Sequence, residues 1–512
     1  MPLESLLQPV LRVICGQSCQ REYDMRQCPR FTMSRNPNEF EMNRRSFLGL
    51  AGGGLGSLAL AHLRELEGFA LPANLGNAVN PLAPKTPHFA PRAKAVICLF
   101  QNGGPSQMDL FDPKPELNKR AGQDYPRNDL EIHFDKQAGK LLQSPFKFSK
   151  SGQSGTELSE LLPHTAAITD QMTLVRSMTT DSVDHESALR IIHSGKFQAG
   201  RPTWGSWVLY GLGTERQELP AYVVLADPGG LPIDGIRNWS SGWLPAIYQG
   251  TQIRSSGSPM FNLATPSDVP AGARANQLSL LEKLNRAHLR EHPENTELQA
   301  RINNYELAAR MQTSVTDALD LGLESEETRK LYGLDHAHKA TANYAKRCLM
   351  ARRLVEKGVR FVQIYLQGQP WDTHDKNAEK LKDLCLMTDQ PSAALVMDLK
   401  RRGLLDSTIV IWSGEFGRLP ISQGKDGRDH NRHGFSLWLA GGGFKQGYVH
   451  GTTDDFGYKA AQDPVRVYDL HATLLRALGL DHNRLTYPHE GRDDTLTDSV
   501  VTNARVVPEL LV

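Results

Sequence analysis

An acid and an imidazole lie two positions apart just after a predicted strand. Val359 to Leu366 is a largely apolar run, and Asp372 and His374 follow it closely. In extended backbone, positions i and i+2 face the same way, so both side chains can reach one ion. Carboxylate and neutral imidazole are good ligands for zinc and similar divalent ions. The pair therefore predicts a metal site, with a solvated loop as the alternative.

A second carboxylate follows another predicted strand. Thr408 to Trp412 is rich in β-branched residues, and Glu415 comes shortly after it, between Gly414 and Gly417. The glycines permit close approach of other backbone to this position. On its own, Glu415 would pair with Arg418 at the surface. Its place beside an equivalent strand end favours a functional role.

The segment from Gly427 to Gly434 gathers further imidazoles and cations. Just before an apolar strand that starts at Phe435, it holds Arg428, Asp429, His430, Arg432 and His433. The two histidines are candidates for further metal ligands, and the arginines suit a sulfate, phosphate or carboxylate group. A surface loop with chance histidines is the alternative.

A short helix is predicted between Asp184 and Gly195. Asp184 suits an N-cap, Gly195 suits a C-cap, and the apolar residues between them have helical spacing. His185 then lies in the first turn, where free N–H groups and the positive end of the helix dipole attract anions. Glu186 is as well suited to capping as to catalysis, and His193 near the helix end is expected to be structural.

These residues need a sheet that brings the ends of separate strands together. Apolar runs predict buried strands at Ala95–Phe100, Thr173–Val175, Ala221–Leu225, Val359–Leu366, Thr408–Trp412 and Phe435–Leu439. Long helical stretches separate them, and the helix predicted at Asp375–Arg402 ends at Gly403 and leads into a strand. The predicted fold class is α/β, a three-layer, mostly parallel sheet with helices on both faces. In such sheets, ligands bind at the carboxyl ends of the strands.

Other segments define the domain organisation. An amphipathic, charged stretch at about 274–321 contains no strand, and we predict that it is a helical insertion in a domain spanning residues 93–490. Residues 65–92 are rich in Pro, Asn and Ala and predict a linker. Residues 491–512 are expected to form a C-terminal tail.

Length and composition say more about possible binding partners than about the fold. The 512 residues allow one large or two medium domains. A formal net charge of +1, with 22% charged residues, gives no bias toward polyanions, so no nucleic-acid partner is expected. The six cysteines lie in the N-terminal region or far apart, and they predict no essential disulfide.

The strongest compartment signal lies near the N-terminus. Arg44 and Arg45 precede a weakly apolar run from Gly49 to about Leu63, and residues 42–64 resemble a bacterial twin-arginine export signal. A buried Gly/Ala helix is the alternative. Residues 1–41 are a leader of doubtful status, because Met42 is a candidate start codon. We expect the twin-arginine machinery to deliver a periplasmic or secreted protein with no stable transmembrane domain, and anchoring by an uncleaved signal stays open.

The order of motifs from Ala95 to Leu480 resembles the alkaline-phosphatase-like superfamily, which contains sulfatases, phosphatases and phosphoglycerate mutases. The first strand with its Gly-rich turn is similar to the opening of that superfamily, and Val467–Leu480 resembles a late helix of sulfatases. The successive metal-ligand segments are matched by Asp372 with His374, by Glu415, and by His430 or His433.

A narrower set of motifs resembles a bacterial family known as domain of unknown function 1501. The set comprises the twin-arginine leader, Gly103–Ser106 leading to Asp109–Lys114, and Gly414–Arg418. The combination indicates kinship and implies no established activity.

Three positions depart from the superfamily pattern. The usual Ser, Thr or modified Cys nucleophile at a helix start is matched by His185. The usual Asp-His pair after the strand at Thr408–Trp412 is Glu415-Phe416, and the usual acid after the first strand is Asn102, for which Asp109 is close enough to substitute. The departure at His185 argues against the usual covalent intermediate.

The resemblance implies an exported metal-dependent hydrolase of phosphate or sulfate esters. One divalent ion (zinc, manganese or calcium) would be held by Asp372, by His374 and by either His430 or His433. Glu415 and Asp109 would complete or support that shell. Arg418 and Arg428 would hold the substrate, a small anionic ester or a sulfated or phosphorylated polymer.

Two chemistries and one rival function remain open at this point. His185 would attack the ester itself, or it would serve as a ligand while metal-bound water attacks, and the second is preferred. The alternative function is a non-catalytic, exported binding or scaffold protein that retains the fold without turnover. The changes at His185 and Phe416 are what that alternative predicts.

Overall fold

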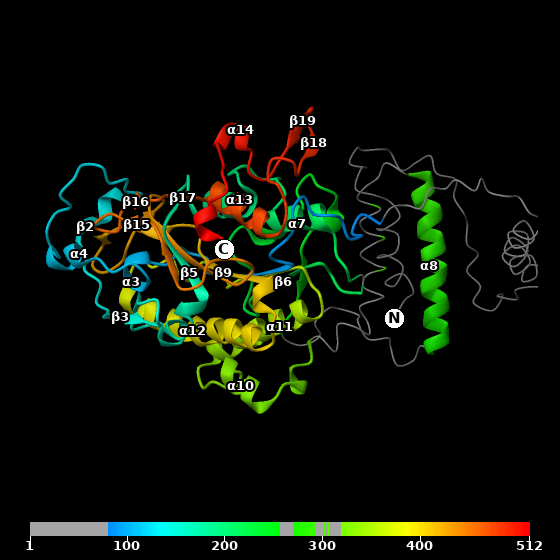
Figure 1. The fold of residues 1–512 in the computed structure, drawn as a ribbon, viewed down its shortest axis with the longest axis horizontal. Coiled ribbons are helices and arrows are strands. Elements are labelled where there is room, and N and C mark those ends of the chain that lie inside the picture. Colours follow the sequence, from blue (N-terminus) through cyan, green and yellow to red (C-terminus); the bar gives the residue numbers. More distant parts are fainter. Residues whose placement is uncertain are drawn as a thin grey trace, which may run out of the picture. The chain divides into compact units, whose positions relative to one another are not determined.

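The computed structural model describes residues 80–216, 218–255, 270–292, 298, 302, 306 and 319–512 (Figure 1). The predicted leader at residues 1–41, the predicted export signal with Arg44 and Arg45, and the predicted linker up to residue 79 lie outside this part of the chain. The described residues form one unit. Among the described helices, none is both long enough and apolar enough to cross a membrane.

The core of the unit is a sheet in which one strand is reversed. In spatial order its strands are β14 (Tyr448–His450), β5 (Met172–Thr179), β13 (Phe435–Ala440), β9 (Thr408–Ser413), β1 (Ala95–Phe100), β8 (Phe361–Ile364), β6 (Tyr222–Leu225) and β7 (Thr251–Ile253), with β17 (Val465–Arg466) also beside β5. β13 pairs antiparallel with β5 and β9, and the other pairings described in this sheet are parallel. Residues 414–434 contain no helix that would return the chain to the opposite edge, so β13 runs back from the edge where β9 ends.

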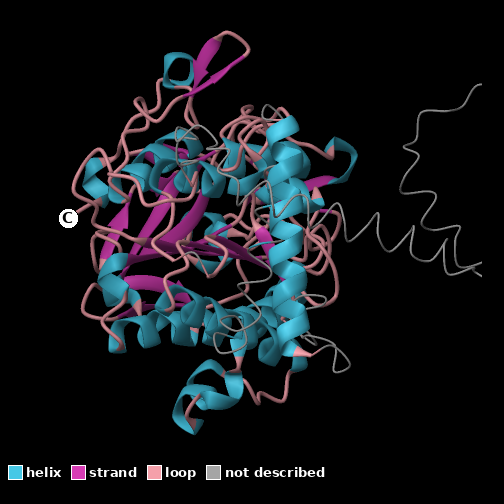
Figure 2. Ribbon diagram, turned by 90° about the vertical axis from the view of Figure 1, so that its right-hand side faces the viewer, coloured by secondary structure: helices cyan, strands magenta, loops and turns pink. Residues whose placement is uncertain are grey.

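Helices cover both faces of the sheet (Figure 2). One face carries α11 (Lys339–Glu356) and α12 (Asn377–Arg401), and the other carries α6 (His185–Ser194), α7 (Trp204–Leu212) and α13 (Val467–Ala477). Along β1, Ile97 and Leu99 pack into the core with α11 and α12, while Val96 and Cys98 pack into the core with α7 and α13. This alternation is the two-residue period of a strand buried on both sides. The predicted three-layer α/β fold is confirmed.

The carboxyl ends of the parallel strands meet at one edge, and reversed β13 begins there. The segments at this edge carry the candidate residues: His185 opens α6 after β5, Asp372 and His374 follow β8, Glu415 follows β9, and His430 lies in β12 (His430–Asn431) just before β13. β12 pairs antiparallel with β10 (Gly417–Arg418), which sets Arg418 opposite His430. The sheet therefore gathers residues that are far apart in sequence.

Both ends of α6 and the end of α12 lie close to the residues that the sequence predicts as helix ends. The Asp184 carboxylate accepts the N–H of Ser187 at 3.0 Å, and α6 ends at Gly195, whose φ of 75° is left-handed. Gly403, just beyond α12, has a φ of 67°. α8 (Ala271–Glu291) falls in the predicted helical insertion, most of whose remaining residues lie outside the described part.

The stretch predicted as a C-terminal tail packs onto the unit. It includes β19 (Arg492–Asp494), which pairs with β18 (Tyr487–His489). Leu496, Val507 and Leu510 are buried in the same apolar core as α7 and α13. Residues 491–512 are therefore a structural part of this unit.

Candidate metal centre

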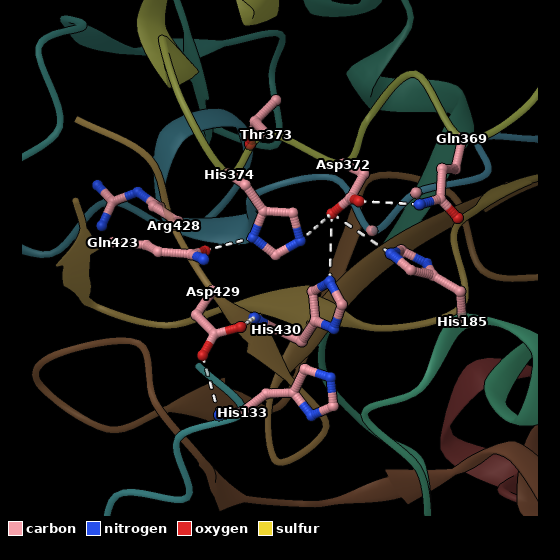
Figure 3. Close-up of polar contacts among 12 residues, drawn as sticks. His133, His185, Gln369, Asp372, Thr373, His374, Gln423, Arg428, Asp429 and His430 are labelled. Carbon is pink, nitrogen blue, oxygen red and sulfur yellow. Dashed lines mark hydrogen bonds and ion pairs between the residues drawn. The ribbon is translucent and has the colours of Figure 1, made fainter. Parts of the chain in front are cut away.

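One carboxylate oxygen is the meeting point of three imidazoles. Asp372 Oδ1 lies 2.8 Å from Nε2 of His374 and 3.2 Å from Nε2 of His430. Nε2 of His185 is 3.3 Å from the same oxygen (Figure 3). One donor atom from each of these four residues lies within 4.8 Å of every other. Such spacing suits four ligands of a single ion.

The second nitrogen of two of these imidazoles is held by an acceptor. Nδ1 of His185 contacts Glu415 Oε1 at 2.7 Å. Nδ1 of His430 donates to the carbonyl of Val183, also at 2.7 Å. A carboxylate and a carbonyl only accept, so Nδ1 carries the proton and the neutral ring presents a lone pair on Nε2.

The third imidazole is oriented through two glutamines. Nδ1 of His374 bonds Gln423 Oε1, and Gln423 Nε2 donates to Gln137 Oε1 at 2.8 Å. In this arrangement the amide oxygen of Gln423 faces His374. His374 therefore donates from Nδ1 and, as a neutral ring, also presents a lone pair on Nε2 toward Asp372.

The four residues fit a divalent ion. When all three rings are neutral, three imidazole nitrogens and one carboxylate oxygen offer lone pairs toward one point, as the ligands of a divalent ion do. Nε2 of His185 is buried without a hydrogen-bond partner, although Asp372 is near. Imidazoles whose outer nitrogen donates to a carboxylate, an amide or a carbonyl are the form in which histidine ligates metals.

The protonation of His185 dominates the electrostatics of the cluster. Burial disfavours its charged form, but Asp372 and Glu415 outweigh burial and raise the pKa of His185 to about 9. Burial lowers the pKa of His430 to about 4. Burial also opposes the charge of Asp372, yet the imidazoles and Arg418 hold its pKa well below the usual range. A proton on Nε2 of His185 would compete with an ion for that nitrogen, so ion affinity would rise with pH.

Glu415 supports the cluster from behind. Its side chain is fully buried, and its two oxygens accept the backbone N–H of Gly103 at 2.8 and 3.0 Å. Gly103 has a φ of 118°, and a Cβ there would lie 2.6 Å from the backbone nitrogen of Asp372, so only glycine fits. The loop after β1 thus fixes Glu415 against His185. Its predicted supporting role fits this geometry better than direct ligation.

Arg418 orients the cluster, which corrects its predicted role in holding the ester. The side chain is completely buried, and Nη2 donates to Asp372 Oδ1 at 2.7 Å. Nε donates to the carbonyl of Gly104 at 2.9 Å, and Nη1 donates to the carbonyl of Arg428 at 3.0 Å. These bonds leave the guanidinium committed to the protein, where it fixes the carboxylate of Asp372.

Arg428 and Asp109 pair with each other, which corrects both predicted roles. Nε and Nη2 of Arg428 donate to the two oxygens of Asp109 at 2.8 and 3.1 Å, and both side chains are fully buried. Ser106 Oγ and Asn377 Nδ2 also donate to Asp109, at 2.6 and 3.0 Å. Although burial opposes its charge, Arg428 keeps the pKa of Asp109 below the usual range. Asp109 is thus a structural anion that does not reach the cluster, and Arg428 is not available to bind an ester.

The choice between the two downstream histidines falls on His430. Nε2 of His433 contacts Glu131 Oε2 at 2.8 Å, and its side chain is 35% exposed. His433 is therefore engaged outside the cluster, which corrects its expected place as a candidate ligand. Asn102 also stays outside, because it bonds the backbone of Leu366 in both directions, at 3.1 and 3.2 Å.

Sequence reasoning missed the groups that hold the ligands. Gln369 Nε2 donates to Asp372 Oδ2 at 2.9 Å, and Gln423 holds His374 (Figure 3). The Asp429 carboxylate accepts the backbone N–H groups of His133 and Phe134. Gln369 lies three residues before Asp372 and could have been suspected, whereas no local pattern marks His133 or Phe134.

One side of the cluster is open to solvent. The exposed fraction of the side chain is 27% for His374, 12% for Asp372 and 10% for His185. Phe416, which takes the place of the histidine usual in the superfamily, is fully buried, with its ring centroid 4.7 Å from those of His185 and His430. The centre therefore has an apolar inner wall and an approach from the side of His374.

Three solved structures illustrate what the chain is similar to. The PsFucS1 sulfatase from Pseudoalteromonas sp. has 11% identity, covering 76% of this chain and 68% of that one, with a TM-score of 0.34. The phosphonate monoester hydrolase SpPMH from Silicibacter pomeroyi has 9% identity, covering 82% and 76%, with a TM-score of 0.33. A protein in the alkaline phosphatase superfamily from Vibrio parahaemolyticus has 10% identity, covering 78% and 70%, with a TM-score of 0.29.

Comparison of the sequence with protein-family models identifies the family of the chain. A search of curated proteins finds no significant match. The family described as "Protein of unknown function (DUF1501)" matches residues 93–511. The chain belongs to this DUF1501 family.

Proposed function

We propose that this protein is an exported, metal-dependent hydrolase of phosphate or sulfate esters. The observation that carries the proposal is the convergence of His185, His374 and His430 on Asp372 Oδ1, with each imidazole held at Nδ1. In a catalytic metal site of this kind, protein ligands hold the ion on one side, and the other side is open to substrate and water.

The donor set favours zinc over manganese and calcium. Three of the four donor atoms are imidazole nitrogens, contributed by His185, His374 and His430. Calcium takes six to eight oxygen ligands, whereas imidazole suits zinc and other transition ions. Calcium is therefore dropped from the ions expected from sequence.

His185 serves the reaction as a ligand. Its Nδ1 is held by Glu415 and its Nε2 points into the cluster, so neither nitrogen is free to attack an ester. Bound in the cluster, a divalent ion would supply an activated water and offset charge on the ester oxygens. Glu415 keeps the proton on Nδ1 of His185, and Arg418 holds Asp372 in place while balancing its charge.

A non-catalytic binding protein is the second candidate, and one observation favours it. The two arginines expected to hold the anionic ester, Arg418 and Arg428, are buried and hydrogen-bonded to the protein. An ester would then be held mainly through the ion. A protein that only binds metal and anions needs no further cation at this site.

Turnover separates the two candidates. We expect the purified full chain, loaded with Zn²⁺ or Mn²⁺, to hydrolyse aryl phosphates or aryl sulfates, because the cluster would activate water beside the ester. Activity should disappear with a chelator and return when the ion is added back. Stoichiometric metal binding without hydrolysis of any aryl phosphate or sulfate would instead select the binding protein.

We further propose export by the twin-arginine pathway. Replacing Arg44 and Arg45 with lysines is expected to leave the protein in the cytoplasm, because the signal depends on the guanidinium pair and not on charge alone. Cell fractionation with a folded periplasmic reporter fused after residue 92 measures this. Unchanged delivery of the Lys-Lys variant would contradict the proposal and point to general secretion.

A further inference from the structure

A short segment, residues 133–137, is tied to the metal centre at two points. The Asp429 carboxylate, which is nearly buried, accepts the N–H of His133 at 2.9 Å and that of Phe134 at 2.8 Å through Oδ2, and its Oδ1 accepts the N–H of His430 at 2.7 Å. Farther along, Gln137 holds the glutamine that orients His374. We call residues 133–137 the rim segment, because these bonds fix it beside two of the three imidazoles.

The rim segment presents two aromatic rings to the cluster. The ring of His133 stacks on that of His430, with centroids 5.3 Å apart and an interplanar angle of 20° (Figure 3). The ring of Phe134 meets His374 edge to face at 5.1 Å and lies 6.0 Å from His430. Both rings thus contact imidazoles that converge on Asp372.

Phe134 is only partly buried by the rest of the protein. Phe134 as a whole residue is 38% exposed, and its neighbour His374 has the most exposed side chain of the four converging residues, at 27%. A large aromatic ring left open beside the open side of a polar centre can bury further area only against a bound molecule. The backbone bonds to Asp429 would form with any residue except proline at position 134, so they do not explain an aromatic ring there.

We propose that Phe134, with His133 beside it, forms the contact surface for the organic group of the substrate, so that the centre prefers esters with an aryl or similarly flat, apolar group. The anionic head would face the ion and the flat group would lie against the rim segment. This inference rests on the proposed function, because it assumes that an anion reaches the ion. It adds a determinant of specificity that is separate from the ligands.

Calorimetric titration of the zinc-loaded full chain with two non-hydrolysable probes tests this inference. Phenylphosphonate and methylphosphonate carry the same anionic head and differ in the ring. We expect phenylphosphonate to bind about 10-fold tighter, and Phe134→Ala to reduce this ratio to about one while leaving methylphosphonate affinity nearly unchanged. Phe134→Tyr should keep most of the preference, and Phe197→Ala, at another exposed phenylalanine, should keep all of it.

Each outcome has a distinct meaning. A phenyl preference that survives Phe134→Ala would overturn this inference and leave the proposed function standing. Equal affinity of the wild-type protein for both probes would do the same. Failure of the zinc-loaded wild-type protein to bind either probe would overturn the proposed function, and this inference with it. An equal loss of affinity for both probes in Phe134→Ala would show that Phe134 only shields the ligands, which also contradicts the proposal.

Discussion

Replacing Asp372 with alanine is expected to lower the affinity for Zn²⁺ or Mn²⁺ by more than about 100-fold. Among the four converging residues in the described part of the chain, Asp372 is the only carboxylate, and its Oδ1 lies within 3.3 Å of Nε2 of each imidazole. Loss of groups that merely support ligands already costs about 10- to 100-fold, so loss of the charged ligand should exceed that range. Competition titration against a chromogenic chelator measures the change.

Asp375→Ala is the matched control for this variant. Asp375 lies three residues away, its side chain is 66% exposed, and its partner is Lys380 at the surface. Its removal should leave metal affinity within about 2-fold, because a solvated carboxylate outside the cluster contributes little. Equal affinities for the wild-type protein and Asp372→Ala would show that the ion binds elsewhere.

Replacing Arg428 with methionine is expected to destabilise the protein by about 3–5 kcal/mol in the free energy of unfolding. The variant would leave Asp109 as a fully buried carboxylate without its cation. Two donors, Ser106 and Asn377, would remain, but neither carries a charge. Urea denaturation followed by fluorescence measures the loss, and the slope of the transition shows whether unfolding stays two-state.

Two further variants show whether the uncompensated charge is the cause. Arg127→Met removes a pair with Asp454 in which the arginine side chain is 40% exposed, so it should cost no more than about 1 kcal/mol. Combining Arg428→Met with Asp109→Leu should recover much of the stability, because it removes the orphaned charge. A double variant as unstable as the single one would show that the pair is needed for shape and not for charge balance.

Local patterns in the sequence predict the ligands that follow parallel strands. Asp372 and His374 come after a strand with an apolar run, and parallel strands end at one edge, so their position in the sheet follows from sequence. The helix that starts at His185 is marked by its own caps. Short-range patterns therefore fix which of these residues reach the site edge, although they do not fix the role of each.

Roles that depend on distant partners could not be predicted in this way. Asp109 and Arg428 are 319 positions apart, and only the folded chain shows that they neutralise each other. His430 and His433 have similar local settings, and the pairing of β12 with β10, together with Glu131, decides between them. The rim segment is held by Asp429 across 296 positions. Long-range hydrogen bonds of this kind leave no periodic trace in sequence.

The reversed strand illustrates the same limit for the fold. The apolar run at Phe435 predicts a buried strand, and the run has the same appearance in either direction. Its direction follows from the helix-free connection of residues 414–434, which stays at the edge where β9 ends. Glu415 reaches the centre because it follows β9, whereas His430 lies just before β13 and is at the same edge because that strand is reversed.

Metal analysis of the purified full chain tests the central claim most directly. After loading with Zn²⁺ or Mn²⁺ and extensive dialysis, plasma mass spectrometry should find about one ion per chain in the wild-type protein and almost none in Asp372→Ala. A wild-type protein that retains no zinc or manganese would contradict the account. So would an Asp372→Ala variant that retains as much metal as the wild-type protein.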